Sequence, residues 1–199
     1  DIALNGANIA EKIRPTLMKQ VDLDSLQRLD IIFTTEDEVS NGFAVPANYT
    51  VIWVDQNDMA VWTEGEKWLN IVLAHELQHL VYFNVTKSWL PFPMNELYGR
   101  VPGWVVEGMA EYYTEDWRPE RFDISHKYHV LKNSVHKIKD PHNDGFSKIL
   151  YLADRFGDET LANILNHRDT LKLFNFSNAF KKYTGITLKK FEEDWRRTM

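Results

Sequence analysis

Apolar residues recur at helical spacing near the start of the chain, where Ile9, Ile13 and Leu17 would share one face of a helix over residues 2–20. Pro15 lies inside this stretch, and proline lacks the N–H group that the interior of an α-helix uses. The pattern therefore predicts one helix that is kinked or divided at Pro15.

Two short runs of β-branched and aromatic residues follow, LDIIFTT at 29–35 and YTVIWV at 49–54. Turn-forming residues, Asn41-Gly42 and Pro46, bound these runs. We expect the two runs to be strands of a small sheet.

The pattern becomes helical from residue 67 to about 84, with a broad apolar face that predicts a helix buried on most sides. Pro102 takes the favoured first position of another helix that extends to about Glu115. Glycines at likely boundaries separate the further helices, which are predicted at 121–139, 146–156, 158–166, 171–183 and 187–197.

Segregation of strands and helices along the chain predicts an α+β fold. A chain of 199 residues is expected to be a single domain, with a sheet-bearing lobe over 1–84 that holds the buried helix and a helical lobe over 85–199. The small N-terminal sheet would pack on that helix. Because the sequence starts at Asp1 without an initiator Met, we expect that a leader, a pro-segment or the neighbouring domains of a larger, multidomain protein precede it.

Composition narrows the possible partners. The formal net charge is −6 and no stretch is rich in Lys and Arg, so nucleic acid is not expected to bind. No run is apolar enough to predict a membrane span. The chain has no cysteine, so any metal ion must be bound by histidine and carboxylate groups.

The strongest chemical signal is HELQH at residues 75–79. Four residues of helix bring His75 and His79 onto one face, where two imidazoles can bind one ion. Zinc suits neutral imidazole, and a catalytic zinc has three protein ligands with a fourth position for water. Glu76 would lie beside that water. The plain alternative is a core helix with two hydrogen-bonded histidines.

A second element is PGWVVEGMAEYYTED at residues 102–116. Glu107 and Glu111 lie one helical turn apart along the edge of its apolar stripe. We expect both carboxylates to be partly buried, and a buried carboxylate needs a cation or hydrogen-bond donors.

HELQH followed by WVVEGMAEY resembles the gluzincin superfamily of zinc peptidases, which includes thermolysin and the aminopeptidase-N family. The segment at 145–157 resembles the helix that follows the active site in aminopeptidase-like gluzincins. The segment at 178–195 resembles the terminal helices of secreted bacterial peptidase-MA domains, and the segment at 41–54 resembles the edge strand that precedes the metal helix in those domains. The resemblance implies a thermolysin-like fold in which His75, His79 and Glu107 bind Zn²⁺. It also implies that Glu111 accepts a hydrogen bond from the other ring nitrogen of the first histidine, His75, and so orients it.

The resemblance implies a metallopeptidase that hydrolyses peptide bonds through a zinc-activated water, with Glu76 as the general base. The Gly-x-Met-x-Asn element with which aminopeptidases hold a free N-terminus is absent, which favours an endopeptidase. The substrate would be a peptide or protein. By the same resemblance, the location would be secreted, periplasmic or at the cell surface.

His142 lies three residues before Gly145, where the relatives carry a tyrosine that donates to the oxyanion. The resemblance thus implies His142 as a catalytic donor. The alternatives are that His142 is a loop residue without a role and that Tyr112, Tyr113 or Tyr151 is the donor. For the whole chain, the alternatives are a catalytically inactive peptidase-like binding module of a larger protein and a zinc hydrolase of another kind.

Overall fold

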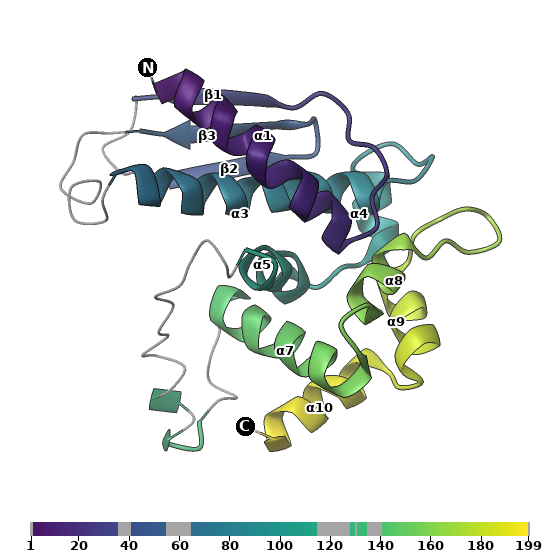
Figure 1. Cartoon of the computed structure of the whole chain (residues 1–199). Helices are drawn as coiled ribbons and strands as arrows, with labels where there is room; N and C mark the ends of the chain where they lie inside the picture. The colour runs from purple at the N-terminus through teal and green to yellow at the C-terminus, as the bar shows by residue number, and fades with distance from the viewer. Residues whose placement is uncertain are drawn as a thin grey trace. The chain divides into compact units, whose positions relative to one another are not determined.

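The computed structural model describes residues 2–35, 41–54, 65–114, 128–129, 131–134 and 141–198 (Figure 1). Two compact units make up the chain. The first unit comprises Asp1–Asn84 and Tyr113–Pro119, and the second comprises Val85–Tyr112 and Glu120–Met199. At a coarse level the α+β prediction is confirmed, because the described part is mostly helical with one three-stranded sheet.

The sheet belongs to the first unit and contains β1 (Asp30–Thr34), β2 (Asn41–Val45) and β3 (Tyr49–Trp53). Its order is β1-β3-β2, with β1 parallel and β2 antiparallel to the central β3. The runs predicted at 29–35 and 49–54 are confirmed as β1 and β3. The pattern did not predict β2 as a separate strand, because its Asn41-Gly42 start is typical of a turn.

The register shows which face of the sheet is covered. Phe33, Ile52 and Gly42 are paired across the three strands, so their side chains point to the same face. On this face Phe33 contacts Gly6 of α1 (Ile2–Gln20), while Gly42 lies against Val72 of α3 (Gly65–Val85). The helices α1 and α3 therefore pack on one face of the sheet.

The helix α1 runs without interruption through Pro15, so the predicted division at that residue is wrong. Pro15 is on the exposed side of α1. There the carbonyl group that loses its N–H donor can be hydrated, which makes a proline inside the helix tolerable. Ile9, Ile13 and Leu17 form the buried side, as predicted.

The helix α3 is the most deeply buried element of the first unit, since every residue from 73 to 82 is buried. This confirms the predicted helix at 67–84 and its burial on most sides. None of the described helices has the length and apolar character that a membrane span needs.

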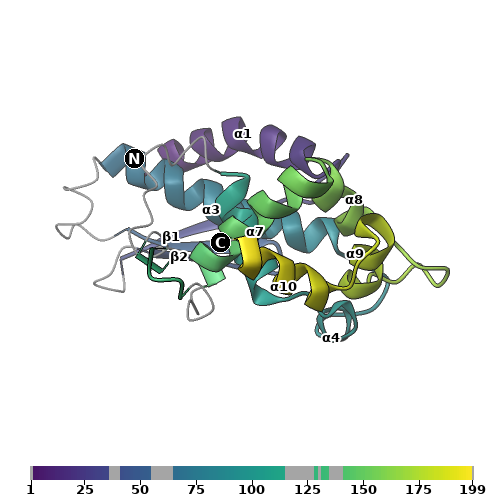
Figure 2. The same ribbon diagram turned by 90° about the horizontal axis from the view of Figure 1, so that it is seen from below.

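The second unit is helical. Its elements are α4 (Met94–Gly99), α5 (Gly103–Tyr112), α7 (Pro141–Phe156), α8 (Thr160–Asn166), α9 (Phe176–Thr184) and α10 (Leu188–Thr198). Helix α9 lies beside α8 and α10 (Figure 2). The core of the second unit contains five fully buried aromatic side chains: Phe174, Phe176, Phe180, Phe191 and Trp195.

Several helix ends differ from the predictions. Helix α7 begins at Pro141, five residues before the predicted start at 146, so Gly145 is inside the helix and not at its boundary. Helix α9 begins only at Phe176, because Asn175 caps it by accepting a hydrogen bond from the backbone N–H of Asn178. The helix predicted at 121–139 lies mostly outside the described residues.

Candidate metal site

The helix α3 carries His75, Glu76 and His79 in its buried middle, with exposed fractions of 6%, 6% and 8%. The two imidazoles lie one turn apart on the same side, and their Nε2 atoms are 3.0 Å apart. The rings meet edge to face, with an interplanar angle of 86°. Burying three such polar groups together costs free energy unless hydrogen bonds or an ion compensate.

Two facing Nε2 atoms have two chemical explanations. One nitrogen can donate a hydrogen bond to the other, or both can direct lone pairs to a single cation. Two ligands of a tetrahedral zinc at about 2.05 Å would have their nitrogens roughly 3.3 Å apart. The observed separation of 3.0 Å is close to that value, so the pair fits zinc with a small adjustment.

The side chain of Glu76 lies against β2 at Gly42, which has no side chain of its own. A Cβ atom on Gly42 would lie 2.9 Å from Cγ of Glu76 and 2.9 Å from Cδ1 of Ile52. Gly42 therefore leaves the space that the Glu76 side chain occupies beside β2. The sequence pattern does not report this function of Gly42, because Asn41-Gly42 by itself is typical of a turn.

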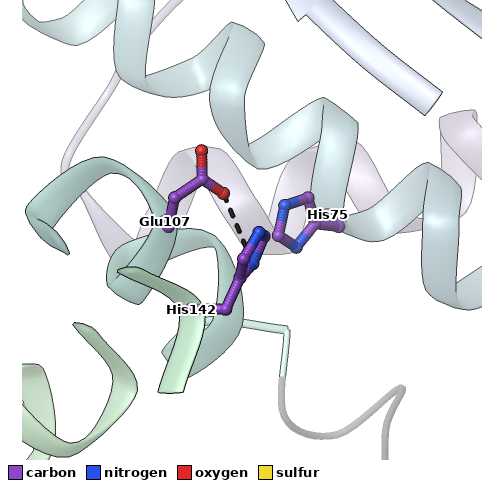
Figure 3. Close-up of side chains that lie close together, drawn as sticks. All are labelled: His75, Glu107 and His142. Carbon is purple, nitrogen blue, oxygen red and sulfur yellow. Dashed lines mark ion pairs between the residues drawn. The ribbon is translucent and has the colours of Figure 1, made fainter. Parts of the chain in front are cut away.

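In the second unit, two helices bring together Glu107, Glu111 and His142. The Nδ1 atom of His142 is 2.9 Å from Oε1 of Glu111 and 3.5 Å from Oε2 of Glu107. Figure 3 shows His142 and Glu107 pointing toward one another. The Glu111 side chain is only 2% exposed, compared with 28% for Glu107 and 44% for His142.

The contact with Glu111 determines how His142 can act. An ionised carboxylate only accepts hydrogen bonds, so Nδ1 of His142 must carry the proton and donate it to Glu111. In a neutral ring, Nε2 then keeps a lone pair. Metal-binding histidines typically have this arrangement, in which a carboxylate holds the nitrogen that does not bind the metal.

A close approach of two helix backbones produces this arrangement. A Cβ atom on Gly145 would clash with the carbonyl oxygen of Trp104 and with the backbone of Gly108. The helices α5 and α7 therefore touch at these two glycines. Gly108 lies between Glu107 and Glu111 in the sequence, and His142 is one turn before Gly145, so the crossing brings the imidazole to the carboxylates.

His75, Glu107 and His142 offer two imidazoles and a carboxylate, which are donor types that could hold a metal ion. Such donors serve several divalent metals and are not specific to zinc. His75 belongs to the first unit, whereas Glu107 and His142 belong to the second.

Each residue expected to form the site is described. His75, Glu76 and His79 lie together on α3, and Glu107 and Glu111 lie together on α5. The structure pairs Glu111 with His142, a contact that the sequence analysis did not predict. That Glu111 orients a histidine of α3 stays a prediction.

His142 lies in the first turn of α7, so the alternative that it is a loop residue is wrong. Its role as oxyanion donor stays a prediction. Of the rival tyrosines, Tyr151 has its hydroxyl engaged by Nη1 of Arg155 at 3.0 Å and its ring against Phe191. Tyr151 is thus tied to the core of the second unit.

No protein-family model, curated protein or solved structure matches the chain.

Proposed function

We propose that the chain is a zinc-dependent metallopeptidase of the gluzincin kind, with a thermolysin-like fold. His75, His79 and Glu107 would hold the zinc. The observation that carries the proposal is the pair of facing imidazoles on α3, buried next to the carboxylate of Glu76. A structural helix gains nothing from burying these three groups together.

The chemistry follows from the positions of these residues. When bound, zinc would polarise the scissile carbonyl group and lower the pKa of a water molecule. Glu76, one residue after a ligand, would accept a proton from that water and pass it to the leaving amine. One carboxylate would thus act first as a base and then as an acid.

The second unit would supply Glu107 as third ligand together with its supporting groups. His142 is held by Glu111, which is almost fully buried, and this contact fixes the direction of the imidazole ring. To donate a hydrogen bond to the carbonyl oxygen as negative charge develops on it, His142 would carry a second proton on Nε2, while its Nδ1–H stays on Glu111.

An endopeptidase acting on extended peptides or proteins is the activity proposed. The sequence lacks the element with which aminopeptidases hold a free N-terminus, and β2 has a strand edge that could pair with an extended chain. We also propose an extracytoplasmic location, as part of a larger protein, by resemblance to secreted peptidase-MA domains.

The deciding experiment is Glu76→Gln. The variant is expected to keep its zinc and fold but lose peptidase activity, because an amide cannot accept the proton from water. Cleavage of a peptide library is followed by mass spectrometry, and zinc is measured by elemental analysis. A chelator should abolish cleavage by the parent chain, and added zinc should restore it.

Glu193→Gln is the matched control, because Glu193 is a described carboxylate on α10, far along the chain from Glu76. The control should cleave at the parental rate. Parental cleavage by Glu76→Gln would refute the general-base role. Zinc binding without any cleavage by the parent would favour a catalytically inactive binding module.

A further inference from the structure

Large apolar side chains project into solvent from one part of the second unit. Their exposed fractions are 67% for Trp89, 59% for Phe92, 56% for Met94, 78% for Leu97 and 66% for Leu171. We call these five residues the apolar patch. Single exposed apolar residues are common on soluble proteins, but a contiguous group of this kind is unusual and often functional.

Hydrogen bonds hold the two segments of the apolar patch side by side. Nε1 of Trp89 donates to the carbonyl oxygen of Leu171 at 2.9 Å. Further along the same two segments, the hydroxyl of Tyr98 donates to Asp169 at 3.2 Å. The side chain of Asn175 donates to the carbonyl oxygen of Tyr98 at 2.9 Å. These bonds hold the two segments of the apolar patch side by side, with Trp89 against Leu171.

The short helix α4 orients part of the apolar patch. Its buried residues are Asn95 and Gly99, which leaves Met94 and Leu97 on the solvent side. The Asn95 side chain accepts a hydrogen bond from Ser88 and donates one to the carbonyl oxygen of Thr86. The exposed side chains thus stand on a fixed backbone and do not cover a core of their own.

The two segments of the apolar patch carry three exposed cations, although the chain as a whole has a net charge of −6. Lys87, Arg100 and Lys172 are exposed on the same two segments. The acidic residues there are Glu96, where burial raises the pKa of the carboxyl, and Asp169, which accepts hydrogen bonds from nearby backbone N–H groups. On these two segments the three cations outnumber the two carboxylates, which favours an anionic partner.

We infer that the apolar patch docks the protein on an anionic lipid surface. Apolar and aromatic side chains that project from short segments can enter the boundary between headgroups and acyl chains, while neighbouring cations bind the headgroups. Trp89 suits this position, because indole combines a large apolar ring with one polar group. The inference does not depend on the metal site, whose residues are elsewhere in the chain.

Vesicle binding by the full chain tests the inference. Co-sedimentation is measured with vesicles of phosphatidylcholine alone and of phosphatidylcholine mixed with phosphatidylserine. The parent chain is expected to bind the mixture more tightly. Leu97→Ser should weaken that binding about tenfold, the effect of losing one inserted leucine side chain. Lys172→Asn should weaken it about fivefold, and only on the anionic vesicles.

The matched control is Leu4→Ser, because Leu4 of α1 is 63% exposed but belongs to the first unit. It should bind vesicles like the parent. The inference fails if the parent does not bind anionic vesicles, or if Leu97→Ser binds as tightly as Leu4→Ser. It also fails if the parent chain does not bind vesicles and light scattering shows that it self-associates through Leu97. The apolar patch would then contact a second copy of the chain.

Discussion

Gly108 of α5 and Gly145 of α7 lie in backbone contact, and neither has room for a side chain. Their contact places His142 beside Glu107 and Glu111, so two residues without side chains determine where three functional side chains meet. The geometry of the candidate site in the second unit therefore depends on the closeness of two helices.

Gly145→Ala is expected to destabilise the second unit by roughly 1–3 kcal/mol or more, because the new methyl group would meet backbone atoms, which cannot rotate away. It should also move His142 from Glu111. Urea unfolding measures the first effect, and the NMR shift of the His142 ring protons measures the second.

Gly103→Ala is the control for this prediction. Nothing lies within 4 Å of a Cβ atom at Gly103, which is also in α5. Alanine there should be neutral or stabilise by up to about 1 kcal/mol, through its better helix propensity. Equal effects of the two alanine substitutions would contradict the importance of the close crossing.

Metal content distinguishes two possible ligand sets. We expect one zinc per chain and its loss in His75→Ala, His79→Ala and Glu107→Ala, whereas His142→Phe should retain zinc and lower kcat by about 10²–10³. Elemental analysis and steady-state kinetics measure the two effects. Loss of zinc from His142→Phe with full zinc in His79→Ala would instead make His142 the ligand, in line with its carboxylate-held imidazole.

Lys148 of α7 is a buried cation whose removal should be costly. Its Nζ atom is 2.7 Å from Asp144 and 3.8 Å from Glu192, and it lies 4.9 Å from the ring centres of Trp104 and Trp195. Lys148→Ala should lower the free energy of unfolding by roughly 2–4 kcal/mol, since two carboxylates lose a shared cation.

Lys190→Ala is the comparison for Lys148→Ala. Lys190 also pairs with an aspartate four residues away, Asp194 at 2.6 Å, but its side chain is 48% exposed. Removing such a surface pair should cost roughly 0–1 kcal/mol. Urea unfolding of both variants under the same conditions compares their free energies of unfolding. Similar losses of free energy would show that the burial of Lys148 adds nothing to stability.

Asp169 should make the second unit sensitive to acid. Hydrogen bonds from the backbone N–H of Leu173 first, and also from Leu171 and from Tyr98, hold the pKa of Asp169 below its usual value. Because the pKa is lower in the folded state, the ionised Asp169 stabilises that state at pH values above the pKa of an aspartate in the unfolded chain, which is about 3.9. This stability is lost as the pH falls through the pKa of the folded state.

Asp169→Asn should therefore be less stable than the parent at neutral pH, and the difference should shrink at about pH 3. Denaturant midpoints at the two pH values measure it. Asp154→Asn, on the exposed side of α7, should follow the parent at both. If the difference in stability between Asp169→Asn and the parent did not change with pH, the charge of Asp169 could not be its cause.

The sequence was sufficient to locate the helices that carry the candidate ligands. Because α3 is buried on most sides, most of its residues are apolar. The helical pattern and the pair His75 and His79 therefore appear together in one short segment of the sequence. The same holds for Glu107 and Glu111 on α5. Local periodicity reports such features because each depends on residues within a few turns.

Contacts between distant segments could not be predicted in the same way. The pairing of His142 with Glu111 depends on the crossing at Gly108 and Gly145, and a glycine at 145 was interpreted as a helix boundary. The local pattern at Gly42 is likewise typical of a turn, although Gly42 lies in β2 beside Glu76. In each case the glycine is needed for tertiary packing, which local patterns do not report.

Arg168 donates hydrogen bonds to the carbonyl oxygens of Leu165, His167, Val85 and Lys87. Val85 is the last residue of α3, and it precedes Arg168 by 83 positions. During synthesis on the ribosome, the carbonyl groups of Val85 and Lys87 can accept these hydrogen bonds only after Arg168 has been made. The C-terminal end of the helix with the two histidines thus gains this partner only once 83 more residues have been added.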